Sequence, residues 1–353
     1  MRHIVHILPA LPFGGAEKMV VELIRHSNRE EFNFSIITFF DNNPLAAELP
    51  PDVPVFVVSK KGKLDWGLIG RVQKQLEILQ PDIVHTHLFG GDVWGRLAAR
   101  RLRIPVITTE HNINIGESWV HALVKRWLRH KSQIHVALSQ AIAHYMQRTY
   151  GIHDPQIIPT GVELERFTNV TAPVFGTPLK ILLLGRLTVQ KGQIIALRAL
   201  SGIRHHNWRL TIAGNGEDKE KLVHMTNALA LADRVRLVSA THDVSKLLAE
   251  HDVLIMPSLW EGLGIVAREA MAAGRVVIAS RTGGLPEFIT HGQTGYLVEP
   301  NDVGALREAI KHVIEYPDEA LSVAAEARVF ADANFGIMPM VVAYSALYRQ
   351  LVP

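Results

Sequence analysis

Short apolar runs alternate with amphipathic helical patterns along most of this chain, and they do so in two successive series. In the first series the candidate strands are residues 4–8, 34–40, 53–58, 83–85, 106–109 and 135–138. In the second they are residues 180–184, 209–213, 234–238, 253–256 and 276–279. Strands separated by helices form parallel sheets with crossover helices. The alternation therefore predicts an α/β protein built from two similar domains.

The length of the chain agrees with two domains. At 353 residues it exceeds what one hydrophobic core usually organises, and 48% of its residues are hydrophobic. Residues 168–178 collect Pro, Gly and Thr and show no periodicity, which is typical of a domain boundary. We therefore predict domains at residues 1–170 and 178–335, followed by a last helix in residues 336–353.

Composition excludes several classes of protein. With no cysteine, the chain has no disulfide, zinc–thiolate site or thiol nucleophile, which suits a reducing cytosol. No signal peptide pattern and no apolar run of 18 residues is present. The net charge is only +3, without the basic stripe of a nucleic-acid-binding protein. The expected location is the cytoplasm.

The segment PSLWEGLGIVAREAMAAG, residues 257–274, carries the strongest functional signal. A short apolar run precedes it, and a Gly-x-Gly turn leads into a helical pattern. The N-terminus of a helix offers unpaired N–H groups and a partial positive charge, which suit a phosphate. Gly264, Ile265 and Val266 are therefore candidate ligands of a diphosphate. A turn that binds nothing is the alternative for the glycines alone.

Two glutamates, Glu261 and Glu269, bracket this turn. A glycosidase pair needs carboxyl groups roughly 5–9.5 Å apart, whereas eight helical residues rise about 12 Å along one axis. A hydrolytic pair is thus disfavoured. A helical carboxylate at Glu269 suits the hydroxyl groups of a ribose, and Glu261 in the loop suits those of a second sugar.

A second constellation follows the strand at residues 180–184. Arg186 and Lys191 stand between two glycines, five residues apart, and are candidates to hold one diphosphate together. Each cation alone would more often be a solvated surface residue. The first strand likewise runs into Gly14 and Gly15, either a tight turn or a phosphate-binding loop.

These segments resemble family 4 of the retaining glycosyltransferases. The motifs concerned are the E-x7-E spacing, AMAAGRVVIASRTGGLPEFI (270–289), HGQTGYLVEP (291–300), GRLTVQKG (185–192), FGGAEKMV (13–20) and SQAIAHYM with IPTGVELERF (within 139–167). The resemblance implies the GT-B architecture, two facing Rossmann-like domains with an inter-domain cleft. It further implies a last helix that crosses back to the first domain.

The resemblance also implies how the two domains divide the work. The second would hold a nucleotide-diphosphate sugar, with Arg186 and Lys191 on the diphosphate and Glu269 on the ribose. The first would shape the acceptor site. No aspartate is followed by a second aspartate two positions later, so the D-x-D metal clamp of the other large glycosyltransferase architecture is missing. Cationic side chains and a helix end would then replace the metal, and we predict no metal site and no cofactor.

Histidines follow two of the predicted strands. His85 and His87 alternate to one side of a strand, a conceivable metal pair, but no third ligand stands at local spacing. His111 and Asn112 follow the next strand, whose carboxyl end faces a ligand in a parallel sheet. The resemblance implies that His111 reaches the transferred sugar. We place His87 and Asn112 in the acceptor site.

Residues 119–131, WVHALVKRWLRHK, form an amphipathic helical pattern with Lys125, Arg126, Arg129 and Lys131 on a basic face. One interpretation is a helix that packs on the core with a solvated polar side. The other is a helix on an anionic membrane, with tryptophans at the level of the headgroups.

The sequence thus predicts a retaining glycosyltransferase that moves a sugar from a nucleotide diphosphate to a hydroxyl of a saccharide or lipid-linked acceptor. Synthesis of cell-surface polysaccharide or glycolipid is the expected setting. A nucleotide-sugar epimerase and a sugar phosphorylase share the architecture and stay open. A non-catalytic sugar-nucleotide-binding subunit also stays open. Loss of one of four site residues would favour it, but all four are present: Glu261, Glu269, Arg186 and Lys191.

Overall fold

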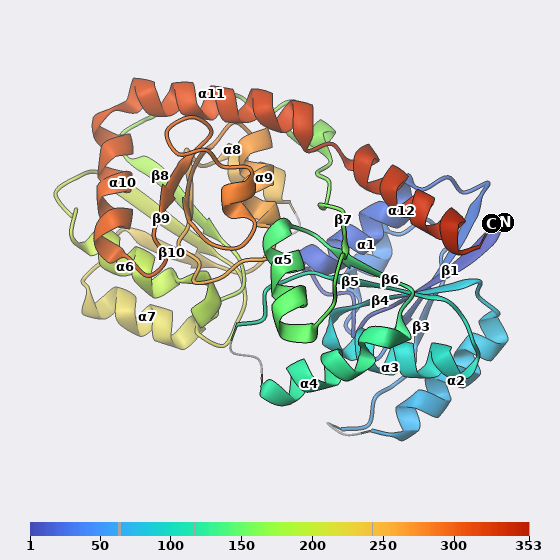
Figure 1. Ribbon diagram of the computed structural model, residues 1–353. Coiled ribbons are helices and arrows are strands. Elements are labelled where there is room, and N and C mark those ends of the chain that lie inside the picture. Colours follow the sequence, from blue (N-terminus) through green and yellow to red (C-terminus); the bar gives the residue numbers. More distant parts are fainter. Residues whose placement is uncertain (63–64, 116–117, 242, 353) are drawn as a thin grey trace. The chain divides into compact units, whose positions relative to one another are not determined.

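The computed structural model describes residues 1–62, 65–115, 118–241 and 243–352. The chain forms two compact units (Figure 1). Unit 1 comprises Met1–Gly161 and Ile337–Pro353, and unit 2 comprises Val162–Gly336. Pro353, the end of the predicted last helix, lies outside the described residues.

Unit 1 contains a parallel sheet that is seven-stranded in the described residues, with the order β3-β2-β1-β4-β5-β6-β7. Its strands are β1 (Arg2–Ile7), β2 (Phe32–Thr38), β3 (Val55–Val57), β4 (Ile83–His87), β5 (Val106–Glu110), β6 (Ile134–Ala137) and β7 (Gln156–Ile157). Its helices are α1 (Gly15–His26), α2 (Gly67–Leu79), α3 (Leu88–Arg101), α4 (Trp119–Leu128), α5 (Gln140–Tyr145) and α12 (Ile337–Leu351). Short turns of other helix types are η1 (Pro44–Glu48), η2 (Arg129–Lys131) and η3 (Met146–Tyr150).

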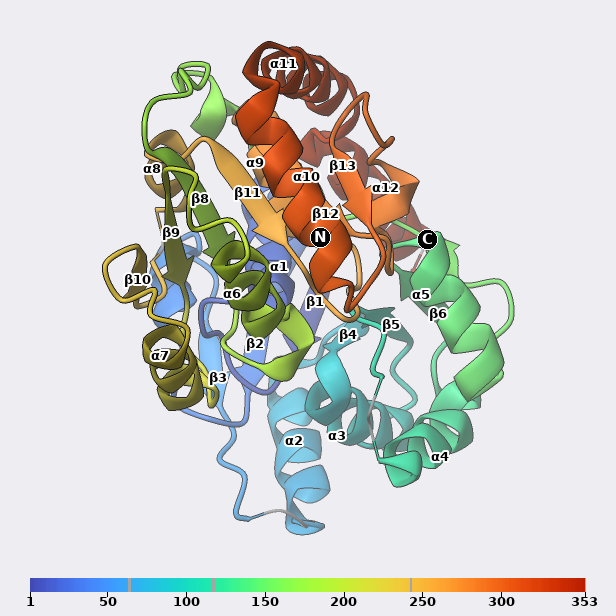
Figure 2. The same ribbon diagram turned by 90° about the vertical axis from the view of Figure 1, so that its left-hand side faces the viewer.

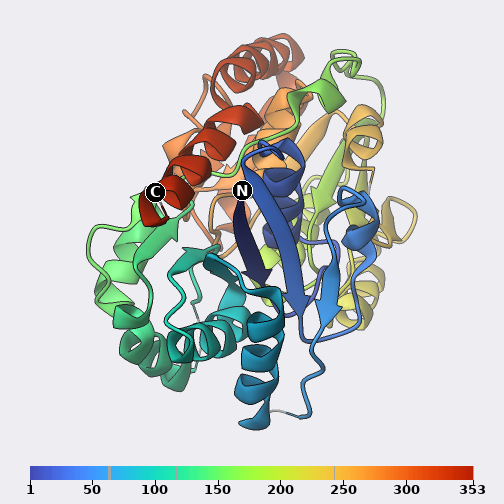
Figure 3. The ribbon, with the colours of Figure 1, turned by 90° about the vertical axis from the view of Figure 1, so that its right-hand side faces the viewer.

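Helices cover both faces of this sheet (Figure 3). On one face, α2 and α3 bury an apolar core with alternate strand residues such as Val5, Ile7 and Val84. On the other face lie α1 and α12, and Tyr348 of α12 reaches β4. The chain termini are close together, because Arg2 Nε donates to the carbonyl of Val352. The segment that follows unit 2 therefore completes the helix layer of unit 1.

Unit 2 repeats this plan with the strand order β10-β9-β8-β11-β12-β13. Its strands are β8 (Leu179–Leu184), β9 (Trp208–Ala213), β10 (Val235–Val238), β11 (Val253–Met256), β12 (Val276–Ser280) and β13 (Tyr296–Val298). Its helices are α6 (Gln193–Ser201), α7 (Lys219–Ala228), α8 (Val244–Ala249), α9 (Ile265–Ala272), α10 (Val303–Glu315) and α11 (Pro317–Asn334). The 3-10 turns are η4 (Leu164–Phe167), η5 (Val189–Lys191) and η6 (Leu285–Glu287).

The sequence of unit 2 explains these layers. Helices α6 and α10 lie on one face of the sheet and α8 and α9 on the other (Figure 2). Strand β8 is therefore covered on both sides, and its continuous apolar run ILLL is buried throughout. Asp302 begins α10 by accepting a hydrogen bond from the Ala305 N–H at 2.8 Å.

All eleven predicted strands are confirmed, with shifts of at most two residues at their ends. The sequence analysis missed β7 and β13, which stand at the last edge of each sheet and have only two and three residues. The predicted α/β class and the two Rossmann-like sheets are confirmed. In each sheet the order reverses beside the first strand, at β1/β4 and at β8/β11. Ligands of such folds bind at the carboxyl ends of the strands beside this reversal.

The units divide at Gly161 and not within residues 168–178, where the sequence analysis placed the boundary. Hydrogen bonds explain the difference. The Val162 N–H donates to the Phe335 carbonyl at 2.7 Å, and the Arg328 guanidinium donates to the carbonyls of Val170 and Phe167 at 2.9 and 3.3 Å. The segment up to Val170 is thus tied to α11 of unit 2, although its composition resembles a linker.

None of the described helices is both long and apolar enough to cross a membrane.

Candidate active site

The loops after β8 and β11 meet at the reversal of the second sheet. Gly185 follows β8 directly, and the segment from Pro257 to Gly264 follows β11. Because parallel strands end at one edge, the two predicted constellations lie on the same edge of one sheet. The structure brings Lys191 and Glu261 into contact there.

Lys191 and Glu261 form an ion pair in the described structure. The Lys191 Nζ lies 2.5 Å from Glu261 Oε1, and the Ser258 hydroxyl donates to the same oxygen at 2.8 Å. The side chains are 16% and 6% exposed, so the pair is shielded from water. Glu261 is therefore held in one orientation by a charged and a neutral donor, as is expected of a carboxylate that positions a sugar hydroxyl.

Arg186 is connected to the same loop through glutamines. Its Nη2 donates to Gln190 Oε1 at 3.3 Å, and Gln190 Nε2 donates to the Trp260 carbonyl at 3.0 Å. Gln193 Nε2 donates to the Arg186 carbonyl at 2.8 Å. Both glutamines are buried. Gln190 links the Arg186 loop to the Glu261 loop, and Gln193 ties the Arg186 loop to the start of α6. The sequence analysis missed this bracing, because a lone glutamine carries no motif signal.

Two glycines allow the loops to approach one another. A Cβ on Gly192 would lie 1.9 Å from the Pro257 carbonyl oxygen, and one on Gly283 would lie 2.0 Å from the Glu261 carbonyl oxygen. Both residues also have left-handed backbones, with φ of 66° and 57°. Any larger residue at either position would separate the loop that carries Lys191 or Glu261 from its neighbour.

Helix α9 begins at the predicted place, after Gly264 with φ 81° and ψ 51°. The N–H groups of Ile265 and Val266 stand in its first turn, where no carbonyl of the helix itself can accept them. Glu269 lies one turn further along and is 4% exposed. The helix start and the Glu261 loop are thus continuous, so the predicted phosphate donors and the two carboxylates lie on one segment.

The first unit has its own glycine loop. Gly14 precedes α1, and its carbonyl accepts the Lys18 N–H at 2.9 Å. The Glu17 carboxylate folds back onto the turn, because a Cβ on Gly14 would lie 2.2 Å from Glu17 Oε2. A phosphate at Gly14 and Gly15 would require this carboxylate to turn away. The predicted donor contact of these glycines stays a prediction.

His87 and His111 lie together at the reversal of the first sheet. His87 ends β4, His111 follows β5, and His87 Nδ1 is 3.1 Å from His111 Nε2. Burial is the main cause that lowers the pKa of His111 to about 4; Asp92 opposes it, and Lys125 adds a smaller lowering effect. Within the described residues His111 Nδ1 and Asn112 Oδ1 have no hydrogen-bond partner. Unpaired buried polar atoms in a predicted sugar and acceptor site indicate places for ligand hydroxyls.

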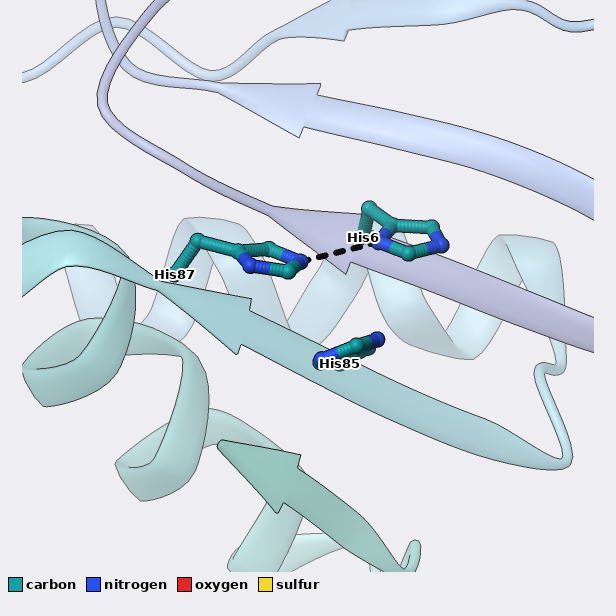
Figure 4. A group of neighbouring side chains, drawn as sticks. All are labelled: His6, His85 and His87. Carbon is teal, nitrogen blue, oxygen red and sulfur yellow. Dashed lines mark hydrogen bonds between the residues drawn. The ribbon is translucent and has the colours of Figure 1, made fainter. Parts of the chain in front are cut away.

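A third histidine, His6, stands next to His85 and His87 (Figure 4). The parallel register pairs His6 of β1 with His85 of β4, so that all three imidazoles share one face of the sheet. The sequence analysis found no third ligand because it considered local spacing alone. Ligand atoms of the three residues lie within 4.8 Å of one another, so the three imidazoles are close enough together to be a candidate metal site.

The predicted basic face of residues 119–131 is partly wrong. Lys125 is 2% exposed and forms an ion pair with Glu110, and its Nζ lies 3.9 Å from Asp92 Oδ2. Arg96 joins the same buried group at 3.2 Å from Asp92. A buried cation is stable only with such partners. The exposed residues of α4 are instead Trp119, Val120, Leu123, Arg126 and Trp127.

Family models match both halves of the chain. Residues 13–166 match Glycosyltransferase Family 4, and residues 169–330 match Glycosyl transferases group 1. The chain belongs to this glycosyltransferase family. The resemblance seen in the sequence motifs is therefore confirmed, and so is transferase activity with a nucleotide sugar.

Similar proteins and structures are known for this glycosyltransferase. It is 28% identical over 284 residues to the glycogen synthase of Mycobacterium tuberculosis, covering 76% of this chain and 69% of that one. It is 24% identical to the UDP-Gal:alpha-D-GlcNAc-diphosphoundecaprenol alpha-1,3-galactosyltransferase of Escherichia coli, covering 90% and 88%. The crystal structure of Anabaena Alr3699/HepE in complex with UDP and glucose matches 99% of this chain and 100% of that one with a TM-score of 0.87 at 20% identity. The fold is thus that of GT-B glycosyltransferases.

Proposed function

We propose that this glycosyltransferase moves a hexose from a uridine-diphosphate sugar to a hydroxyl group of a saccharide or lipid-linked acceptor. Its setting would be the synthesis of cell-surface polysaccharide or glycolipid. The names of the galactosyltransferase and of the structure with UDP and glucose support the donor and acceptor classes.

The contact between Lys191 and Glu261 carries this proposal. A cation and a carboxylate held at 2.5 Å, beside the start of α9, offer separate partners for a diphosphate and for sugar hydroxyls. Arg186 would be the second diphosphate ligand. Glu269 would accept hydrogen bonds from the ribose, and the Ile265 and Val266 N–H groups would donate to phosphate oxygens. His87 and Asn112 would contact the acceptor, and His111 the transferred sugar.

The reaction we propose keeps the configuration of the donor's anomeric carbon. The bond from that carbon to the phosphate oxygen breaks, and its electron pair leaves with UDP. The acceptor oxygen forms the new glycosidic bond on the same face, and its proton passes to the leaving phosphate. Negative charge grows on the diphosphate, and Arg186, Lys191 and the helix N-terminus would stabilise it. These groups take the place that a D-x-D metal site has in the other architecture.

A test of this function measures UDP release from a panel of uridine-diphosphate hexoses, with saccharide and undecaprenol-diphosphate-linked acceptors. Release that requires an acceptor, persists in EDTA and gives an NMR-detected product of retained configuration is the expected result. Strict dependence on a divalent metal or an inverted product would refute it. Conversion of the donor without acceptor would indicate an epimerase, and release that requires inorganic phosphate a phosphorylase. A sugar nucleotide that binds without turnover would indicate a non-catalytic subunit.

The exposed side of α4 supports a peripheral position on an anionic membrane from the cytoplasmic side. Trp119, Leu123 and Trp127 are 73%, 52% and 60% exposed. The Lys131 Nζ lies 3.9 Å above the Trp127 ring, so a cation accompanies the apolar side chains. Tryptophan beside lysine and arginine is typical of helices at a lipid headgroup layer. With Lys125 buried, Arg126, Arg129 and Lys131 would supply the positive charge.

A further inference from the structure

Three imidazoles form a chain from the sheet of unit 1 to the predicted sugar site. His6 Nδ1 lies 2.9 Å from His87 Nε2, and His87 Nδ1 lies 3.1 Å from His111 Nε2. Figure 4 shows the first of these contacts as a dashed line. His6 and His87 are 0% exposed. The three rings thus make two contacts and leave two free ends, His6 Nε2 and His111 Nδ1, and His111 itself is only partly buried.

The same cluster might suggest a metal site, but its distances fit hydrogen bonds. Two nitrogens that share a tetrahedral zinc ion at about 2.0–2.1 Å each stand roughly 3.3 Å apart. The 2.9 Å between His6 and His87 suits a shared proton instead. His85 is already engaged at both nitrogens, with the Tyr348 hydroxyl at 2.9 Å and Thr109 Oγ1 at 2.8 Å. The described atoms are therefore arranged as a hydrogen-bond network.

The protons on the three imidazoles can be counted. Burial lowers the pKa of His6 to about 3 and that of His111 to about 4, and it lowers the pKa of His87 well below its ordinary value. Each ring is thus neutral at pH 7 and has one N–H. Two of the three N–H groups fill the two contacts, and the third remains at one end, on His6 Nε2 or on His111 Nδ1.

The two ends are not equivalent. His6 Nε2 is buried without a partner among the described residues, and it stands near Phe34, with ring centroids 5.8 Å apart. A buried donor without an acceptor is rarer in proteins than an under-used acceptor. His111 Nδ1 also lacks a partner among the described residues, but His111 is only partly buried and stands at the predicted sugar site, where a ligand oxygen can accept its proton. The favoured arrangement therefore leaves His6 Nε2 without a proton. His6 Nδ1–H then donates to His87, His87 Nδ1–H donates to His111 Nε2, and His111 carries its proton on Nδ1.

We propose that His6 and His87 are positioning residues that fix the tautomer of His111, so that His111 presents an Nδ1–H donor to the transferred sugar. Both the role of His111 at the sugar and the choice of this tautomer rest on the proposed function, because His111 Nδ1 has no partner among the described residues. An N–H in this place requires an oxygen acceptor on the sugar, such as a hydroxyl. A donor whose hydroxyl is removed at that carbon would lose the contact and leave the N–H unpaired.

The backbone around His87 fixes the position of its side chain relative to His6. Leu88 follows it with a left-handed φ of 58°, so the chain turns sharply from β4 into α3. A Cβ on Gly91 would lie 2.3 Å from the Ile7 carbonyl oxygen, which shows how closely α3 approaches the end of β1. Both the His6 strand and the His87 strand are therefore fixed at this junction, and the distance between the rings is set by the sheet.

The direct test is ¹⁵N NMR of the histidine side chains in the full-length protein at pH 7, with signals assigned through single substitutions. The expected result in the wild type is an Nδ1–H tautomer for His111 and for His87. In His6→Phe the donor to His87 is lost, and the His111 signals should move toward a mixture of tautomers. His6→Asn, whose amide reaches the position of Nδ1, should restore the wild-type signals. His85→Asn is the matched control, because His85 is equally buried but lies outside the chain.

Turnover adds a second readout. We expect kcat/KM to fall roughly tenfold in His6→Phe and to recover in His6→Asn, because one hydrogen bond to the sugar is worth about a factor of ten. An Nε2–H tautomer of His111 in the wild type would overturn the proposal, even if His6→Phe did not fold. So would unchanged His111 signals in a folded His6→Phe, or one tightly bound metal ion per chain that disappears with His6. None of these NMR or metal results depends on the proposed donor or acceptor.

Discussion

Replacing either Lys191 or Glu261 by a neutral residue should lower both the free energy of unfolding and kcat, and the two effects can be measured separately. Two unit charges 2.5 Å apart attract by about 7 kcal/mol at an effective dielectric constant near 20, and desolvation offsets most of this. Exposed pairs contribute less than about 1 kcal/mol, whereas breaking a fully buried pair costs roughly 3–5 kcal/mol. Because the side chains are 16% and 6% exposed, we expect Lys191→Met and Glu261→Gln each to lower the free energy of unfolding by about 1–3 kcal/mol.

The two variants should differ in nucleotide binding and chemistry. Lys191→Met removes a proposed diphosphate donor, so UDP should bind more weakly and kcat should fall on the order of 10² to 10³. Glu261→Gln releases Lys191 from its carboxylate, so UDP should bind equally well or more tightly. Its kcat should nevertheless fall, because the sugar loses a charged acceptor. A carboxylate that competes with UDP for one lysine predicts this opposite behaviour.

Calorimetry with UDP, urea denaturation and initial rates of UDP release provide the measurements, with the double variant to obtain the coupling energy. Lys180→Met is the matched control, because Lys180 is an exposed lysine on β8, the strand that precedes the Lys191 loop. Equal weakening of UDP binding by Lys191→Met and Glu261→Gln would refute the idea of a shared lysine. A loss of kcat below fivefold in Lys191→Met would remove this residue from the diphosphate site.

Three further predictions concern other parts of the molecule. Glu269→Ala should weaken UDP binding by about 1.5–3 kcal/mol, and unchanged calorimetry in a folded variant would exclude the ribose contact. Burial lowers the pKa of His6 and His111 to about 3 and 4, so the unfolded chain binds more protons between pH 6.5 and 4. The free energy of unfolding should therefore fall as the pH is lowered through this window, and a flat urea-denaturation series from pH 7.5 to 5 would contradict it. Replacing Trp119 and Trp127 by Gln should reduce cosedimentation with vesicles of anionic lipid, and added salt should reduce it further; equal binding of both proteins would return α4 to an ordinary surface helix.

The sheets could be predicted because strand patterns are local, whereas contacts between distant residues could not. The apolar run of β8 predicts a strand that is buried on both sides. The three residues of β13 lie within a turn-rich segment and give no periodic signal. Lys125 looked like a member of a basic face because its helical position fits one. Only the fold brings Glu110 beside it and so makes its burial possible.

The candidate site shows the same division. Motif spacing placed Arg186, Lys191 and Glu261 in the loops after two strands, and the sheet order puts these two strands, β8 and β11, next to one another. The bracing by Gln190 is invisible in the sequence, because one of its partners, the Trp260 carbonyl, lies 70 residues further along the chain. His6 could have been found from sequence by aligning β1 with β4, since parallel neighbours place residues of equal register on one face.

Helix α12 determines when unit 1 can finish folding during synthesis. The His85 and Thr109 side chains on the sheet of unit 1 bond to Tyr348 and Tyr344, which the ribosome makes only after the whole of unit 2. At about 5–20 residues per second, that interval lasts roughly ten seconds or longer. Until then a nascent unit 1 exposes the face with its buried imidazoles. The growing chain would present an unfinished, aggregation-prone surface during this time, which makes the interval a natural period for a chaperone to act.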